Sequence, residues 1–173
     1  MSTLSRLRDL VADEGEPLAG GLLAQERPGS RTMLGPIVSG GPRASADPGE
    51  YELLIEAIYE GYLLHYGVSR LIAAGDDDLS LLAGDRLYAL GLERLVALGD
   101  VEAVSELADV IALCALLVGR GEDTMCEALW RAGARAVGWG ADESYLAAKA
   151  LARAGDAHAH AALLALDAPP ARA

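Results

Sequence analysis

Three consecutive aspartates, Asp76, Asp77 and Asp78, are the residues whose types first suggest chemistry in this sequence. Carboxylate oxygens are the ligands that Mg²⁺ prefers in proteins, so the run resembles a cation site. The aspartates also begin a helical pattern, where carboxylates stabilise free backbone N–H groups and the positive end of the helix dipole. Successive helical residues point about 100° apart, so the three side chains do not converge on one ion. We therefore expect helix capping here and no metal site.

The histidines offer a second set of candidate groups. His158 and His160 are two residues apart, a spacing that places them on different sides of a helix and disfavours a shared metal ion. Asp156 and His160 have the i, i+4 spacing of a surface contact. His65 lies on the apolar stripe of a predicted helix, where we expect a hydrogen-bonded core residue and not a catalytic base.

Composition excludes several classes of protein. The 173 residues are enough for one compact domain, and a hydrophobic content of 52% is enough to build its core. Acidic residues outnumber basic ones by 26 to 14, for a net charge of −12, which argues against nucleic-acid binding and against a polybasic membrane anchor. Two cysteines, Cys114 and Cys126, are too few for a disulfide scaffold or a cysteine-rich zinc site. We expect both to be buried and free.

The spacing of apolar residues predicts an all-α protein: a single-domain bundle of about five to six helices with an irregular N-terminal arm. Glycines and aspartates mark the helix ends. The expected segments are a short helix over 1–13, an irregular arm over 14–49, a bundle domain over 50–166 and a disordered tail over 167–173. Within the bundle we expect helices over 49–74, 76–98, 101–118, 122–137, 142–154 and up to 166, with 76–98 the most buried.

The segment 14–49 holds five of the seven prolines and many glycines, which prevents a long helix. It also carries apolar residues, including Leu22, Leu34 and Val38, which a solvated linker would not need. We expect this arm to lie against the surface of a partner.

The sequence also predicts where the protein is found. Residues 1–13 read as a short amphipathic helix without the apolar core of a secretory signal. The longest apolar run, 110–118, is about half the length of a membrane span. We therefore expect a cytoplasmic protein without a transmembrane segment, for which peripheral association with a membrane complex stays open.

Two segments resemble the trans-polyprenyl diphosphate synthase family. The first is Glu56-Ala-Ile-Tyr-Glu-Gly-Tyr-Leu-Leu-His65, which resembles the helix before that family's first aspartate-rich motif. The second begins Leu82-Ala-Gly-Asp85 and runs to Leu95, similar to the family's following helix. The resemblance covers residues 50 to about 120 and implies part of the isoprenoid synthase fold.

The elements that bind diphosphate in that family are missing. Directly after His65, where an Asp-Asp-x-x-Asp motif would stand, the sequence has Tyr66 and Gly67. The cationic Gly-Lys-x-x-Arg-Pro signature is matched only weakly, by residues 29–36, which lack the lysine. Nothing after Gly121 resembles the second aspartate-rich motif. Ionising an allylic diphosphate needs metal and cations at the leaving group. The resemblance thus implies a shortened relative with no catalytic residue, metal or cofactor.

Three functions follow in order of preference. The first is a non-catalytic interaction or accessory subunit, bound to a protein partner or to its own copies, in a prenyl-synthase heteromer or a membrane-linked complex. The alternative is a module that binds an isoprenoid or quinone in an apolar pocket lined by Leu64, Val68 and Leu82. The third is a residual prenyltransferase enzyme, which would need Asp76, Asp77 or Asp78 to converge with Glu56 or Glu60 on a metal.

Overall fold

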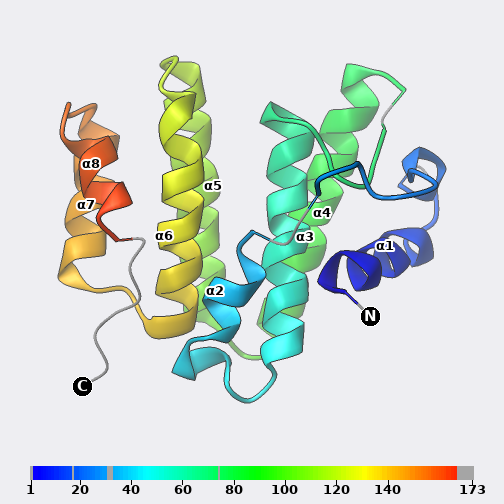
Figure 1. Ribbon diagram of the computed structural model, residues 1–173, viewed down its shortest axis with the longest axis horizontal. Helices are drawn as coiled ribbons and strands as arrows, with labels where there is room; N and C mark the ends of the chain where they lie inside the picture. Colours follow the sequence, from blue (N-terminus) through cyan, green and yellow to red (C-terminus); the bar gives the residue numbers. More distant parts are fainter. Residues whose placement is uncertain (1, 17, 31–32, 74, 167–173) are drawn as a thin grey trace. The chain divides into compact units, whose positions relative to one another are not determined.

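The computed structural model describes residues 2–16, 18–30, 33–73 and 75–166, and these residues are all-α, as the sequence predicts (Figure 1). The predicted tail over 167–173 lies outside them. The helices are α1 (Thr3–Asp13), α2 (Gly35–Ser39), α3 (Pro48–Tyr66), α4 (Asp77–Ala97), α5 (Val101–Gly119), α6 (Cys126–Trp139), α7 (Glu143–Ala154) and α8 (Ala159–Leu164), with 3₁₀ turns η1 (Ala19–Gly21), η2 (Pro42–Ala44) and η3 (Asp123–Met125).

The chain divides into two compact units. Unit 1 consists of Met1–Pro36 and Gly49–Asp100, and unit 2 of Ile37–Pro48 and Val101–Ala173. The predicted bundle domain over 50–166 is shared between the two units, and its action as a single domain stays a prediction.

Unit 1 is built on α3 and α4, with α1 packed against them (Figure 1). Ser2 caps α1 by accepting a hydrogen bond from the N–H of Ser5 at 3.1 Å. Arg6 then ties α1 to the start of α3 by donating to the carbonyl oxygen of Gly49 at 2.8 Å. The shared core consists of Leu4, Leu7, Val11, Leu18, Leu53, Ala57, Leu64, Leu71, Ile72, Ala83, Leu87 and Leu90.

Glycines allow α3 and α4 to approach closely. A Cβ atom on Gly61 would lie 2.9 Å from the carbonyl oxygen of Gly84, and a Cβ on Gly84 would lie 3.0 Å from that of Gly61. Gly91, seven residues after Gly84 and on the same side of α4, accommodates the side chain of Ile58. These contacts determine which side of α4 faces α3.

Helix α3 ends at Tyr66, eight residues before the predicted end of its segment. Beyond Gly67 the chain folds back, so that Arg70 returns to contact α3. Leu71 and Ala73 then form backbone hydrogen bonds with Leu23 and Gly21, each at 2.8 Å. The predicted continuation of this helix to residue 74 was therefore wrong, because contacts between distant parts of the chain replace its last two turns.

The most buried helix of unit 1 is α3 and not α4, contrary to the prediction. Residues 53–61 of α3 are all buried, whereas α4 leaves Leu81, Leu82 and Val96 exposed. The reason is that α3 is covered by α4, by α1 and by the chain before α2.

Asp76 caps α4, as expected. Its Oδ1 accepts a hydrogen bond from the N–H of Leu79 at 2.8 Å, and Asp77 and Asp78 lie in the first turn. We predict that Asp76→Ala lowers the free energy of unfolding by about 1 kcal/mol, because one N–H of the first turn loses its acceptor. Asp78→Ala removes the same charge without removing the cap and should cost less than half as much. Urea denaturation of both variants measures the difference, and equal losses would contradict the capping role.

Unit 2 pairs α5 with α6 and adds α7 and α8 (Figure 1). Its largest fully buried side chains include Leu107, Leu113, Trp130 and Tyr145. Asp142 caps α7 by accepting from the N–H of Tyr145 at 2.9 Å.

The segment over 14–49 packs within its own chain. Leu18 and Leu34 are buried in unit 1, and Val38 and Ala44 are buried in unit 2. Leu34 and Val38 are therefore used inside the protein and are not available to a partner, whereas Leu22 is half-buried. Contact between this segment and a partner stays a prediction. The density of proline and glycine did predict the absence of a long helix here, although α2 and two 3₁₀ turns are present among the described residues.

Candidate functional site

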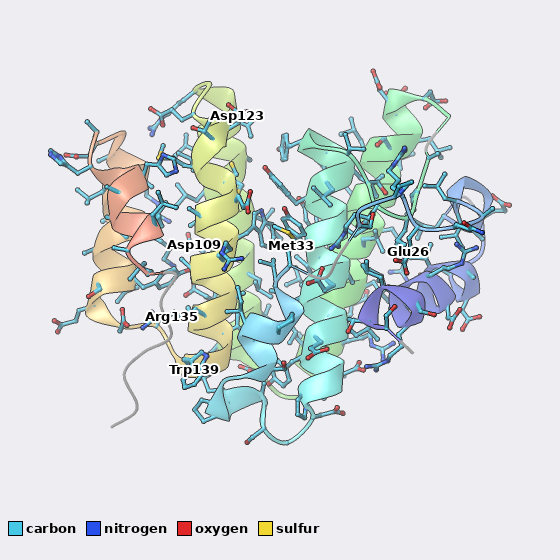
Figure 2. The ribbon with its side chains drawn as sticks, viewed as in Figure 1. Glu26, Met33, Asp109, Asp123, Arg135 and Trp139 are labelled. Carbon is cyan, nitrogen blue, oxygen red and sulfur yellow. The ribbon has the colours of Figure 1, made fainter. Side chains whose placement is uncertain are left out.

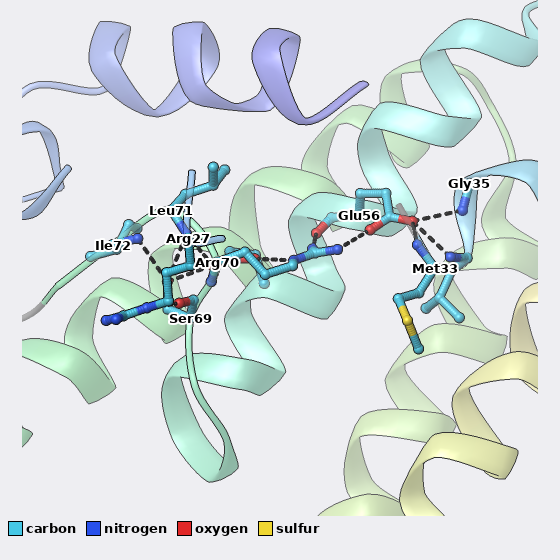
Figure 3. A network of polar contacts seen from close by, with 10 residues as sticks. Arg27, Met33, Gly35, Glu56, Ser69, Arg70, Leu71 and Ile72 are labelled. Carbon is cyan, nitrogen blue, oxygen red and sulfur yellow. Dashed lines mark hydrogen bonds and ion pairs between the residues drawn. The ribbon is translucent and has the colours of Figure 1, made fainter. Parts of the chain in front are cut away.

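Two glutamates on α3 and one arginine form a buried ion network in unit 1. Glu56 and Glu60 lie four residues apart, on the same side of the helix, and neither is exposed to solvent. Nη1 of Arg70 lies 2.5 Å from Oε2 of Glu56, and Nε of Arg70 lies 2.7 Å from Oε2 of Glu60. Figure 3 shows Arg70 reaching Glu56 from the loop that follows α3.

The remaining carboxylate oxygens accept hydrogen bonds from the chain. Oε1 of Glu56 accepts from the backbone N–H groups of residues 33, 34 and 35 at 2.7–2.8 Å (Figure 3). Oε1 of Glu60 accepts from the hydroxyl of Ser69 at 2.5 Å and from the N–H of Arg70 at 2.7 Å. The network therefore fastens two separate loops to α3.

The two carboxylates hold the positive charge of Arg70 in place. Burial by itself disfavours a charged guanidinium, but the carboxylates of Glu60 and Glu56 outweigh it and raise the pKa of Arg70 above its ordinary value. The guanidinium also lies over the ring of Tyr59, 5.3 Å from the ring centroid. An arginine held in this way neither gives nor takes a proton, so the network supports the fold.

A cleft of about 310 Å³ opens beside this network, within unit 1. Leu64, Val68 and Ile72 line it, and so do Asp76 and Asp77. The first turns of α4 are held here because the hydroxyl of Ser80 donates to the carbonyl oxygen of Leu64 at 2.8 Å. The lining of the cleft therefore combines apolar and acidic residues.

Of the three residues predicted to line an apolar pocket, Leu64 and Val68 lie on this cleft and Leu82 does not. Leu64 is buried, whereas Val68 and Leu82 are exposed. An isoprenoid or quinone pocket formed by all three residues stays a prediction.

A second ion network lies in unit 2, around the only lysine of the sequence. Nζ of Lys149 lies 2.5 Å from Glu106 and 2.8 Å from Asp109, and the side chain is almost fully buried. The hydroxyl of Tyr145 donates to Glu106, and burial together with that carboxylate raises the pKa of Tyr145. Arg153 completes the network by contacting Asp109, which is labelled in Figure 2, at 2.5 Å.

The pKa of Asp109 gives a prediction about pH. Partial burial would raise it, but hydrogen bonds from Lys149 and Arg153 outweigh burial and lower it below 3.8. A carboxyl group whose pKa is lower in the folded protein stabilises that state above its unfolded pKa, and this contribution is lost as the pH falls. We therefore expect Asp109→Asn to destabilise the protein at neutral pH, and the deficit to shrink from about pH 5 to about pH 3.

Denaturation at several pH values tests this prediction. The matched control is Leu151→Ala on α7, a half-buried residue whose substitution removes no titratable group. Its deficit should be independent of pH, and a deficit of Asp109→Asn that is equally flat would disprove the assignment.

The histidines and cysteines singled out in the sequence contact neighbouring side chains or are buried in the core. Nε2 of His65 lies 3.1 Å from Asp85, and its ring stacks on that of Tyr88 at 5.2 Å. His158 contacts Asp156 at 2.9 Å, so the predicted pairing of Asp156 with His160 was wrong, because α8 begins only at Ala159. Cys114 and Cys126 are buried and free, as expected.

Among the residues that the structure describes, no group of three or more histidine, cysteine or acidic side chains is arranged to hold a metal ion. Within the same residues, no helix has the length and apolar character needed to cross a membrane.

The ion network of Glu56, Glu60 and Arg70 was not predicted from the sequence. A signal was present, because two glutamates four residues apart stand inside an apolar run on α3. Acidic residues at core positions require a buried cation or several hydrogen-bond donors.

In comparisons with known proteins, no protein-family model, curated protein or solved structure matches this chain.

Proposed function

We propose that this protein is a non-catalytic helical subunit that acts by binding another protein. In the finer form of the proposal, which rests on the family resemblance, the partner is a prenyl synthase or a component of a membrane-linked complex. The observation that carries the proposal is a group of exposed apolar side chains at one end of α3 and α4.

We call this group the α3–α4 tip and define it as Tyr66, Val68, Leu81 and Leu82. Their exposed fractions are 42, 66, 43 and 61%. The contact between His65 and Asp85 holds the end of α3 beside the first turns of α4, so the four residues belong to one region of unit 1. Single exposed apolar residues are ordinary, but four of them in one region of a small protein favour an interaction site.

The surroundings of the tip favour a protein over a lipid. Asp76, Asp77 and Arg27 line the same cleft as Leu64 and Val68. An isoprenoid tail that filled this cleft would remove water from charged groups without supplying hydrogen bonds in exchange. A protein segment can bring both apolar side chains and polar groups.

Buried charged groups give independent support. Catalysis needs groups that can change their protonation or meet a substrate. Glu56, Glu60 and Arg70 are instead engaged with one another and with the backbone, and Lys149 is enclosed by two carboxylates.

Affinity purification of the tagged protein from the cells that make it, followed by light scattering and mass spectrometry, tests the proposal. We expect a stoichiometric complex with an interface of roughly 2,000 Å² or more. A protein that is monomeric in the extract and purifies alone would overturn it.

A further inference from the structure

We infer that the α3–α4 tip recognises a protein segment in which apolar side chains are flanked by arginine or lysine. This inference rests on the proposed function and adds the chemical character of the partner. It follows from the way in which apolar and acidic residues are combined around one cleft.

The apolar part of the surface supplies the anchor. Val68 borders the cleft of about 310 Å³ and is the most exposed residue of the tip, and Leu64 and Ile72 form the wall behind it. This volume suits one or two inserted side chains. Full burial of one such apolar side chain contributes about 1.5–3 kcal/mol to an interface.

Carboxylates surround the anchor. Asp76 and Asp77 line the cleft itself. Asp77 and Asp85 lie four residues before and after Leu81 on α4, and Asp78 lies four residues before Leu82, so each exposed leucine has an acidic neighbour on its own side of the helix. All four aspartates are exposed.

The cations near the tip do not offset these charges. Arg27 also lines the cleft, and its Nε donates to the carbonyl oxygen of Ser69 at 2.7 Å. Arg86, one residue after Asp85, pairs with Glu14 at 2.5 Å. The four carboxylates therefore outnumber the guanidinium of Arg27, and the net charge of this surface is negative. Such a surface attracts a basic segment and repels an acidic one.

Binding of synthetic helical peptides to the full chain tests the inference. Two peptides of about 18 residues, or five helical turns, share one leucine face and carry either arginine or glutamate on the other. We expect the arginine peptide to bind at least about tenfold more tightly, with an association rate that falls as salt is added.

Two variants of the tip, each with a matched control, locate the binding. Asp77→Asn/Asp78→Asn should slow association about fivefold at low salt. Asp123→Asn/Glu127→Gln removes the same charge from exposed positions of unit 2 and should change the rate less than about twofold. Val68→Ser/Leu82→Ser should weaken binding about tenfold or more, and Leu146→Ser/Leu164→Ser, equally exposed in unit 2, should leave it unchanged.

The inference is overturned if the arginine peptide does not bind, if the glutamate peptide binds as tightly, or if the control variants lose as much binding as the tip variants. Because all substituted residues are exposed, circular dichroism should show folded protein in every case. The complex purified from cells distinguishes failure of this inference from failure of the proposed function. A complex purified from cells that survives both tip variants contradicts this inference alone, whereas the absence of any complex contradicts the proposed function.

Discussion

Arg70→Met is expected to lower the free energy of unfolding by about 3–5 kcal/mol. The substitution removes the only side-chain cation in contact with Glu56 and Glu60 among the contacts described, and both carboxylates are fully buried. Methionine fills much of the space but offers no charge and no donor. The decrease in the free energy of unfolding therefore measures the cost of leaving two buried carboxylates without a cation.

The matched control for this prediction is Arg94→Met. Arg94 on α4 also pairs with a glutamate of α3, Glu50, at 2.6 Å, but its side chain is 39% exposed. Exposed pairs contribute little, so the control should lose less than about 1 kcal/mol. Chemical denaturation compares the two variants. Neutralising the carboxylates as well, in Glu56→Gln/Glu60→Gln/Arg70→Met, should recover part of the loss, and equal losses in the two single variants would contradict a special role for the buried network.

Gly138→Ala is the second substitution with a large expected effect, of about 3 kcal/mol. Gly138 on α6 packs directly against the backbone of residues 38–41 within unit 2. A Cβ atom at this position would lie 2.5 Å from the carbonyl oxygen of Val38 and 3.0 Å from its Cα. Because the obstacle is backbone and not the end of a side chain, no change of rotamer relieves it.

Gly119→Ala is the control for Gly138→Ala. Gly119 ends α5 and has no atom within 4 Å of the position that its Cβ would occupy. Alanine favours helix over glycine by up to about 1 kcal/mol, so this variant should be neutral or slightly more stable. Thermal denaturation distinguishes the two substitutions, and a Gly138→Ala protein as stable as Gly119→Ala would show that the α6 contact is not tight.

The parts of the fold that depend on local sequence could be predicted. Periodic apolar residues identify the long helices, and Asp76 and Asp142 identify two of their first turns, because a cap acts within four residues. The end of α3 could not be predicted in this way. It depends on the return of Arg70 to Glu60, ten residues earlier in the chain, and nothing in the local pattern distinguishes that return from two further turns of helix.

The candidate pocket was also predicted only in the part that depends on local sequence. Leu64 and Val68 lie on one cleft because both belong to the end of α3 and the turn after it. The place of Leu82 depends on which side of α4 meets α3, and this is decided by Gly84 and Gly91. Helical spacing alone does not identify which of the leucine-rich sides of α4 packs against α3. The close approach at the glycines could therefore be recognised only from the three-dimensional structure.

The burial of Lys149 has a practical and a cellular consequence. The sequence contains no other lysine, and this one is 5% exposed between Glu106 and Asp109. Enzymes that conjugate ubiquitin-like proteins or acetyl groups to lysine therefore find no accessible lysine amine on the folded chain. Cross-linking reagents likewise find no accessible lysine side chain on the folded chain, whereas its exposed carboxylates offer many positions for coupling.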